Sequence, residues 1–362
     1  MLDFSPTAEQ EEIRRLAHSI AMEQLRPQAR IAEQQASLSP TLAHIVAQTG
    51  LTTPYSEDYG GSGALEAITY VLIAEEFGYG DAGLALHILG AMLAPLTVAL
   101  AGTPAQQAHY LPPFCREPAA HTGSLAFAEP IGGYTLADLS ASAQRSGDAF
   151  LLQGTKRSVL HGQQADLRVV LVRIAGEPSQ FAAFLLPEPC PGLLITPDEQ
   201  KLGLLAAPSA SYTFTDVLLP ASALLGTPGS SAAVLRAYCL ALLLRAGVQC
   251  GLSRAALEYA GEYAKERRAF GRPIVSYQGI AFPIAEIAMK LDGVRLLVWQ
   301  AASAWDNDAS SDYLVRECEA AHTQALKLAK SATIDAVQIL GGAGFLQDHP
   351  VEMWMRAAAS ME

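Results

Sequence analysis

The sequence contains little of what marks secreted, metal-binding or nucleic-acid-binding proteins. Its five cysteines are scattered over 362 residues and none forms a C-x-x-C pair, so neither a disulfide framework nor a zinc site is predicted. Lys and Arg total 24 against 36 Asp and Glu, a formal net charge of -12, which argues against a nucleic-acid partner. The N-terminus lacks the positive flank and apolar run of a secretory signal, so we expect a cytoplasmic protein.

Several common enzyme motifs are also absent. The sequence has no G-x-G-x-x-G after a strand, no Walker loop, no H-E-x-x-H and no G-x-S-x-G elbow. Nicotinamide-dependent, nucleotide-hydrolysing and common hydrolase functions therefore lack support. What the chain does have is apolar content, because 50% of its residues are hydrophobic, enough to build a substantial core.

One apolar stretch has the length of a membrane span. Residues 82–115 contain no Asp, Glu, Lys or Arg, and the part from Leu84 to Leu100 is long enough to cross a bilayer. The same part contains Gly90 and Pro95 among many alanines, which favours a pair of helices buried in a helical domain. We therefore expect no membrane span.

Helical patterns occupy the first third of the chain. Ser5-Pro6 predicts an N-cap followed by proline at the first helical position. Ile13, Leu16 and Ile20 then recur at helical spacing. Similar patterns continue to about residue 115, so we place an N-terminal α-helical domain at residues 1–120.

The pattern changes after about residue 120. Short runs rich in β-branched or aromatic residues, separated by Gly and Pro, indicate a small antiparallel β domain, which we place at residues 121–226. The runs are Phe150 to Leu152, Leu167 to Val172, Phe181 to Leu186 and Tyr212 to Leu219. After a linker at Thr227 to Ser231, long helical periodicity returns, which predicts a C-terminal helical bundle at residues 227–362. The expected fold class is α+β, in the order helices, strands, helices.

Two segments near the C-terminus carry the most chemical information. Arg267 ends a predicted helix and is followed by Phe270 and Gly271, which offer a guanidinium for a diphosphate and a ring face for a nucleobase. In the second segment, Gln338 precedes three glycines within residues 341–344, where the backbone can approach a ligand closely. Each segment alone also fits an ordinary helix end.

In this order along the chain, these segments resemble the acyl-CoA dehydrogenase family. The resemblance also rests on Tyr59-Gly60-Gly61, Asp81-Ala82-Gly83, Ala126 to Pro130, Lys201-Leu202-Gly203 and Phe214 to Pro220. It implies an acyl-CoA dehydrogenase-like fold and α,β-dehydrogenation of an acyl-CoA or acyl-carrier thioester. It also implies FAD as the cofactor, held between two subunits of a homo- or hetero-tetramer, and electron-transfer flavoprotein as the electron acceptor.

The resemblance assigns one half of the FAD site to residues that this chain would offer to a neighbouring subunit. We call this the trans half. All of its residues are present: Arg267, Phe270, Gln278, Gln338, Gly341 and Gly342. A charge-assisted contact between an arginine and a diphosphate contributes on the order of 1.5–3 kcal/mol, so Arg267 is expected to matter most.

The half of the site that the chain would use for its own FAD, the cis half, departs from the family pattern. Where the family reads T-E-P-x-A-G-S-D, this chain has Ala128 in place of the threonine and Tyr134 in place of the serine. Where the family reads K-x-W-I-T-N-G, the segment that begins at Lys156 has Ser158 in place of tryptophan and Leu160 in place of threonine. We therefore expect the ring contact and the hydroxyl donor to the flavin to be missing.

We assign no catalytic residue. Dehydrogenation of a thioester needs a carboxylate to remove the α-proton. In most family members it lies in an E-G-T segment beyond the arginine that corresponds to Arg356, and this chain reaches only Glu362, so we expect a C-terminal domain that lacks its last segment. Other members place it on the helix after the linker, where this chain has Leu240 to Leu244. The arginine that accompanies that site is also missing, unless Arg245 replaces it.

These departures favour a companion subunit that donates trans contacts to FAD in a catalytic partner chain. Three alternatives stay open: an active homotetrameric dehydrogenase whose C-terminal segment is missing from this sequence, a flavin monooxygenase of the same fold, and a scaffold without activity. The acyl substrate is not predicted, because apolar residues from Leu204 to Pro208 replace the polar ones that follow K-L-G in the family.

Overall fold

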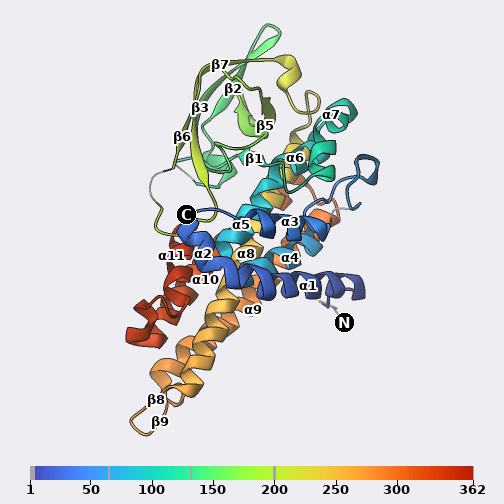
Figure 1. Cartoon of the computed structure of the whole chain (residues 1–362). Coiled ribbons are helices and arrows are strands. Elements are labelled where there is room, and N and C mark those ends of the chain that lie inside the picture. Colours follow the sequence, from blue (N-terminus) through green and yellow to red (C-terminus); the bar gives the residue numbers. More distant parts are fainter. Residues whose placement is uncertain (1–4, 64–65, 131–132, 199–200, 362) are drawn as a thin grey trace.

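The computed structural model of the chain describes residues 5–63, 66–130, 133–198 and 201–361. Helices come first, then a sheet, then long helices, as the sequence predicts (Figure 1). The sheet lies at one end of the molecule, and the C-terminal helices extend away from it. This is the α+β class that the sequence indicates.

The N-terminal region is helical, but its first helix begins later than predicted. The N-cap is Thr7 and not Ser5, because the Thr7 side chain accepts the N–H of Gln10 at 3.2 Å and the Gln10 side chain accepts the N–H of Thr7 at 2.9 Å. This reciprocal pair satisfies two N–H groups that would otherwise lack partners. The helices are α1 (Ala8–Ile20), η1 (Ala21–Leu25), α2 (Arg26–Gln35), α3 (Pro40–Gln48), η2 (Glu57–Tyr59), α4 (Ala67–Gly80), α5 (Ala82–Ala91), α6 (Leu93–Ala101) and α7 (Pro104–Arg116).

The uncharged stretch forms a pair of helices, α5 and α6, as predicted. Two segments of the described chain, Ala82–Ala101 and Ser231–Glu266, are long and apolar enough to span a membrane, with hydropathies of 2.0 and 1.5. In each, 78% of the most apolar window is buried inside the protein. Burial in the core explains the apolar composition of both segments.

The described residues of the middle region form a seven-stranded sheet in the order β1-β4-β2-β3-β7-β6, with β5 paired to β4. The prediction of an antiparallel domain is wrong in part, because β4 pairs in parallel with both β1 and β2. The β2–β3 hairpin lies between β1 and β4 in the sequence and supplies the crossover that parallel neighbours require. The strands are β1 (Gly123–Ala126), β2 (Ser142–Ser146), β3 (Ala149–Leu160), β4 (Leu167–Ile174), β5 (Glu177–Leu186), β6 (Leu193–Pro197) and β7 (Ser209–Pro220), with the short helices η3 (Leu136–Asp138) and η4 (Ala221–Ala223).

The C-terminal region is built around α8, a helix of 36 residues. Its elements are α8 (Ser231–Glu266), the hairpin β8 (Arg268–Ala269) and β9 (Arg272–Pro273), η5 (Ile274–Ser276), α9 (Gln278–Asp306), α10 (Ser311–Leu340), η6 (Gly341–Phe345) and α11 (Val351–Ala359). Buried ion pairs tie this region to α4. Glu76 pairs with Arg254 of α8 at 2.5 Å, and Glu75 pairs with Arg295 of α9 at 2.7 Å. Each carboxylate therefore meets a cation inside the core, which offsets the cost of burying it.

Asp81 gives the fold a testable dependence on pH. It is the N-cap of α5 and its Oδ1 accepts the N–H of Leu84 at 2.8 Å. Burial raises the pKa of Asp81 from 3.8 to about 6. The folded protein therefore binds this proton more tightly than the unfolded chain does, and the stability that the group contributes falls as pH rises from about 4 to about 6.

We predict that Asp81→Asn, which keeps a capping acceptor but cannot ionise, gains stability relative to the wild type over that pH range. The gain reaches at most about 3 kcal/mol at pH 7, because each pKa unit corresponds to about 1.4 kcal/mol. Urea unfolding at a series of pH values measures it. A difference in unfolding free energy that stays constant from pH 4 to pH 7 would contradict the prediction.

Candidate functional site

The two segments of the expected cis half lie side by side. The N–H of Arg157 donates to the carbonyl of Ala128 at 3.0 Å. Lys156 Nζ lies 2.7 Å from Glu129 Oε1, and the two side chains are 0% and 2% exposed. The structure therefore brings these segments together as the sequence leads us to expect. Ile131 and Gly132, which belong to the first segment, lie outside the described residues.

The Lys156–Glu129 ion pair is the electrostatic centre of this half. Burial lowers the pKa of Lys156 to about 8, although the charge of Glu129 opposes the shift. Burial also acts to raise the pKa of Glu129, but Lys156 and hydrogen bonds from Ser140 outweigh it and hold that pKa below its ordinary value. The carboxylate also accepts the N–H of Ala141 at 3.0 Å. Glu129 is thus fully engaged in holding the backbone.

The groups that would face a flavin are missing at Ser158 and Leu160. Ser158 has a φ of 52° and lies where the pairing of β3 with β7 is irregular. Leu160 packs against α5, so closely that a Cβ atom at Gly90 would lie 2.7 Å from Leu160 Cδ1. Leu160 therefore packs an apolar side chain on α5 at the position where the family pattern has a hydroxyl donor.

Tyr134 is folded into the helical core, in a cluster that the sequence does not predict. Its hydroxyl lies 2.5 Å from Arg245 Nη2, and the guanidinium carbon lies 4.3 Å from the centre of its ring. The His322 ring meets it edge-on at 5.1 Å, and Gln249 Nε2 lies 3.4 Å from His322 Nε2. Only the position of Arg245, directly after the run Leu240 to Leu244, hints at such a cluster.

This cluster offers no proton acceptor suited to the α-proton of a thioester. Burial, and to a smaller extent the charge of Arg245, lowers the pKa of His322 to about 3. Glu319 accepts the N–H of Leu136 and contacts the hydroxyl of Tyr238, both at 2.7 Å. The Leu240 to Leu244 run is at most 2% exposed. The carboxylate of Glu319 is therefore engaged through its Oε1 atom at this place.

The segment after Lys201 is used for internal packing. The N–H of Gly203 donates to Ser360 Oγ at 2.8 Å, and a Cβ atom there would lie 2.3 Å from the backbone carbon of Arg356. The carbonyl of Ala206 contacts His87 Nδ1 of α5 at 2.7 Å. The backbone of this segment thus contacts both α5 and α11.

The residues of the expected trans half are all exposed, in contrast to the buried ion pair and packed side chains of the cis half. Phe270 is 97% exposed at the tip of the β8–β9 hairpin, at the lower end of the molecule in Figure 1. Arg267 caps the end of α8, and Gln278 begins α9. The described part of the chain provides no hydrogen bond or ion pair to the side chains of Arg267, Gln278 and Gln338. Their polar groups remain available to a partner.

The glycines at the end of α10 also suit close contact with a ligand. Gly341 has a φ of 59°, a backbone conformation that favours glycine. Cβ atoms at Gly341 and Gly342 would meet nothing within 4 Å. The space next to this backbone is therefore open, and Gln338 lies exposed one turn before it.

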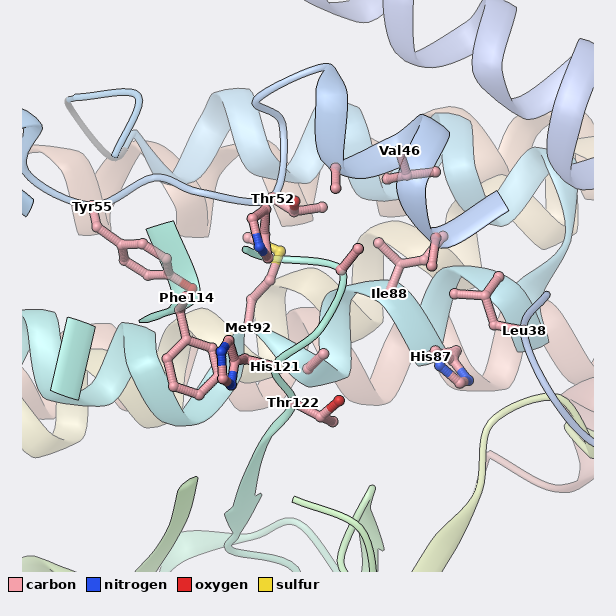
Figure 2. Close-up of a pocket in the computed structure, with 15 residues that line it drawn as sticks. Leu38, Val46, Thr52, Tyr55, His87, Ile88, Met92, Phe114, His121 and Thr122 are labelled. Atoms are coloured by element: carbon pink, nitrogen blue, oxygen red, sulfur yellow. The ribbon is translucent and has the colours of Figure 1, made fainter. Parts of the chain in front are cut away.

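A hollow in the N-terminal domain is a different site (Figure 2). Residues of α3, α5 and α7 line it, including His87 and Phe114, together with Met92, which lies between α5 and α6. It holds about 80 Å³, whereas sites for cofactors and drug-sized ligands are usually larger than about 300 Å³. The hollow is too small for a flavin. In the part of the chain that is described, no cluster of His, Cys, Asp and Glu could hold a metal ion either.

Three family models match the chain one after another. They are described as the acyl-CoA dehydrogenase N-terminal domain, at residues 7–118, the middle domain, at residues 124–217, and the C-terminal domain, at residues 243–362. The three matches follow the order of helices, sheet and helices in the structure.

Known proteins match over the same length. The cyclohex-1-ene-1-carbonyl-CoA dehydrogenase of Syntrophus aciditrophicus (strain SB) is 31% identical over 97% of this chain and 85% of its own length. The mitochondrial short-chain specific acyl-CoA dehydrogenase of Rattus norvegicus is 31% identical over 84% of this chain and 74% of its own. The solved structure of butyryl-CoA dehydrogenase from Megasphaera elsdenii superimposes with a TM-score of 0.82 at 27% identity, covering 99% of this chain and 94% of that one.

This chain belongs to the acyl-CoA dehydrogenase family. The family and fold expected from the sequence are confirmed. The two halves of the chain's surface fit FAD differently. The exposed residues of the trans half suit a diphosphate and an adenine, whereas the cis half presents Leu160 and a Tyr134 side chain that is already engaged by Arg245.

The Lys156–Glu129 pair is open to a direct test. We predict that Glu129→Gln lowers the free energy of unfolding by about 3–5 kcal/mol, because it leaves a buried ammonium without its counter-charge. The double variant Glu129→Gln with Lys156→Met removes both charges and should recover part of that loss. Urea unfolding of the two variants and the wild type measures the effect. Equal stability of the wild type and Glu129→Gln would show that the pair does not hold the segments together.

Proposed function

We propose that this chain is a companion subunit of a hetero-oligomeric acyl-CoA dehydrogenase. It donates the trans half of an FAD site whose cis half and catalytic base belong to a partner chain of the same family. The observation that carries the proposal is the contrast between the exposed, unpaired residues of the trans half and the filled cis half.

The trans half supports the binding of the diphosphate and adenine parts of FAD. The guanidinium of Arg267 is planar and always charged, so it suits phosphate oxygens. The fully exposed ring of Phe270 offers an apolar face to the adenine. Gln338 supplies amide donors and an acceptor, and the open backbone at Gly341 allows a close approach.

The cis half supports the assignment of the redox step to the partner. Bound FAD accepts the hydride that leaves the β-carbon of an acyl thioester. Beside the Tyr134–Arg245 cluster, the carboxylate of Glu319 already accepts the N–H of Leu136 through Oε1, so we assign the removal of the α-proton to the partner. Leu160 supplies no hydroxyl. The chain therefore binds and orients the cofactor without touching the reacting atoms.

The proposal also covers the oligomeric state, the substrate class and the electron acceptor. We infer a mixed tetramer that takes an acyl-CoA or acyl-carrier thioester and passes electrons to an electron-transfer flavoprotein. A match with a TM-score of 0.82 at 28% identity comes from a structure described as the electron transferring flavoprotein of Acidaminococcus fermentans. The five cysteines are all free, which fits a reducing cytoplasm.

The stoichiometry of FAD tests the assembly. The chain is co-expressed with each acyl-CoA dehydrogenase-like chain encoded near it, and FAD is counted per polypeptide in the purified complex. We predict one FAD for every two chains, and no stoichiometric FAD when this chain is purified alone. One FAD per chain in the isolated protein, together with turnover of any acyl-CoA, would overturn the proposal.

A matched pair of variants tests the trans contact. We predict that Arg267→Ala weakens FAD binding by the mixed complex by about tenfold to a hundredfold, because a charged hydrogen bond to the diphosphate is lost. Arg268→Ala, a neighbouring exposed arginine outside the trans half, should leave FAD binding unchanged. FAD released on dilution is measured by flavin fluorescence. Equal retention by the two variants would contradict the assigned role of Arg267.

A further inference from the structure

Tyr134 is held on several sides by residues that lie far apart in the sequence. Its hydroxyl and ring contact Arg245 of α8, and the ring packs at an edge against His322 of α10. The ring of Phe127 lies 5.7 Å from it on the sheet side. These contacts bring the side chain in towards the helices, so it does not stand free at the domain boundary.

The backbone around Tyr134 is fixed as well. The hydroxyl of Tyr238 donates to the carbonyl of Tyr134, and the N–H of Leu136 donates to Glu319 Oε1 at 2.7 Å. On the other side, the N–H of Glu129 donates to the carbonyl of Gly133 at 2.9 Å. The described segment 133–136 is therefore docked on α8 and α10 through both its backbone and its side chain.

The force that keeps this segment docked comes from Arg245. Its side chain is only 7% exposed, and its partners among the described residues are neutral: Tyr134 and the carbonyl of Met361 at 3.2 Å. Arg245 Nε has no hydrogen-bond partner in the described structure. A buried cation whose contacts in the described chain are all neutral depends strongly on each of them. Moving Tyr134 away would remove both the hydroxyl and the ring face from the guanidinium.

We propose that Tyr134 and Arg245 form an internal latch that holds residues 133–136 against the helices and closes this chain's own flavin half-site. The proposal rests on the proposed function, which identifies that half-site with the segments around Ala128 and Ser158. The latch confines FAD to the site that the chain shares with its catalytic partner. The exposed trans half is not affected by it, because Arg267 lies 22 positions further along α8.

Three variants of the isolated chain test the latch. Tyr134→Ser removes the ring and restores the small side chain expected at this position. Arg245→Met removes the cation that holds the ring and keeps an apolar side chain of similar length, so it preserves the core even if Tyr134→Ser folds poorly. Tyr134→Phe separates the two contacts, because it removes the hydroxyl and keeps the ring over the guanidinium.

Two readouts follow each variant: FAD affinity by fluorescence titration, and amide hydrogen exchange of the peptide that covers residues 133–139. We predict that Tyr134→Ser and Arg245→Met bind FAD at least about tenfold more tightly than the wild type and exchange this peptide at least about tenfold faster, as expected when the hydroxyl and ring contacts with the guanidinium together hold the segment closed. Tyr134→Phe loses the hydroxyl contact but keeps the cation–π contact, so it should fall between the wild type and Tyr134→Ser in both readouts.

Each other outcome decides against one of the two proposals. Faster exchange without a gain in FAD affinity would show that the contact only stabilises the segment, and unchanged exchange would show that it does not hold the segment at all. Either result overturns the latch and leaves the companion role intact. Stoichiometric FAD on the isolated wild-type chain, with turnover, would instead overturn the companion role.

Discussion

The packing of α8 is the constraint on which the rest of this structure depends. This helix of 36 residues is buried along most of its length against α4 and α10. It carries Arg245 near its middle and ends at Glu266; its C-cap, Arg267, lies 22 residues beyond Arg245, a separation of about 33 Å at 1.5 Å per residue. One rigid element therefore sets the positions of both the cation that engages Tyr134 and the guanidinium that stays free. Tyr134 is thus engaged near the middle of α8, and Arg267 lies exposed at its C-terminal end.

In the cis half, the residues that hold the two segments together differ from the residues that would touch a flavin. Lys156 and Glu129 depend on each other, because a buried charge that loses its partner is costly, and together they fix the two segments on the sheet. The side chains at positions 158 and 160, which would touch a flavin, do not depend on each other in this way. Ser158 and Leu160 can occupy the flavin-facing positions without breaking the Lys156–Glu129 ion pair, and Leu160 adds packing against Gly90. The fold thus keeps the shape of an acyl-CoA dehydrogenase subunit, while Leu160 stands where the family pattern has a hydroxyl.

The sequence predicts much of this arrangement, since long helices have clear periodicity and the ordered motifs point to one family. It predicts long helices after residue 231, as α8 and α9 are, and identifies Arg267 and Phe270 as ligand-facing candidates, which the structure shows to be exposed. It fails where distant segments meet. Strand direction in β4 depends on a crossover, which alternation of residues does not reveal. The contact of Tyr134 with Arg245 and His322 joins three elements, and no local pattern encodes it.

The most direct test of the account is a density map of the purified mixed assembly with FAD bound. We predict that the diphosphate and adenine lie against Arg267 and Phe270 of this chain, while the isoalloxazine ring lies in the partner chain. In the same map, Tyr134 of this chain should remain on Arg245. An isoalloxazine ring seated against Ser158 and Leu160, with a carboxylate of this same polypeptide facing it, would contradict the account.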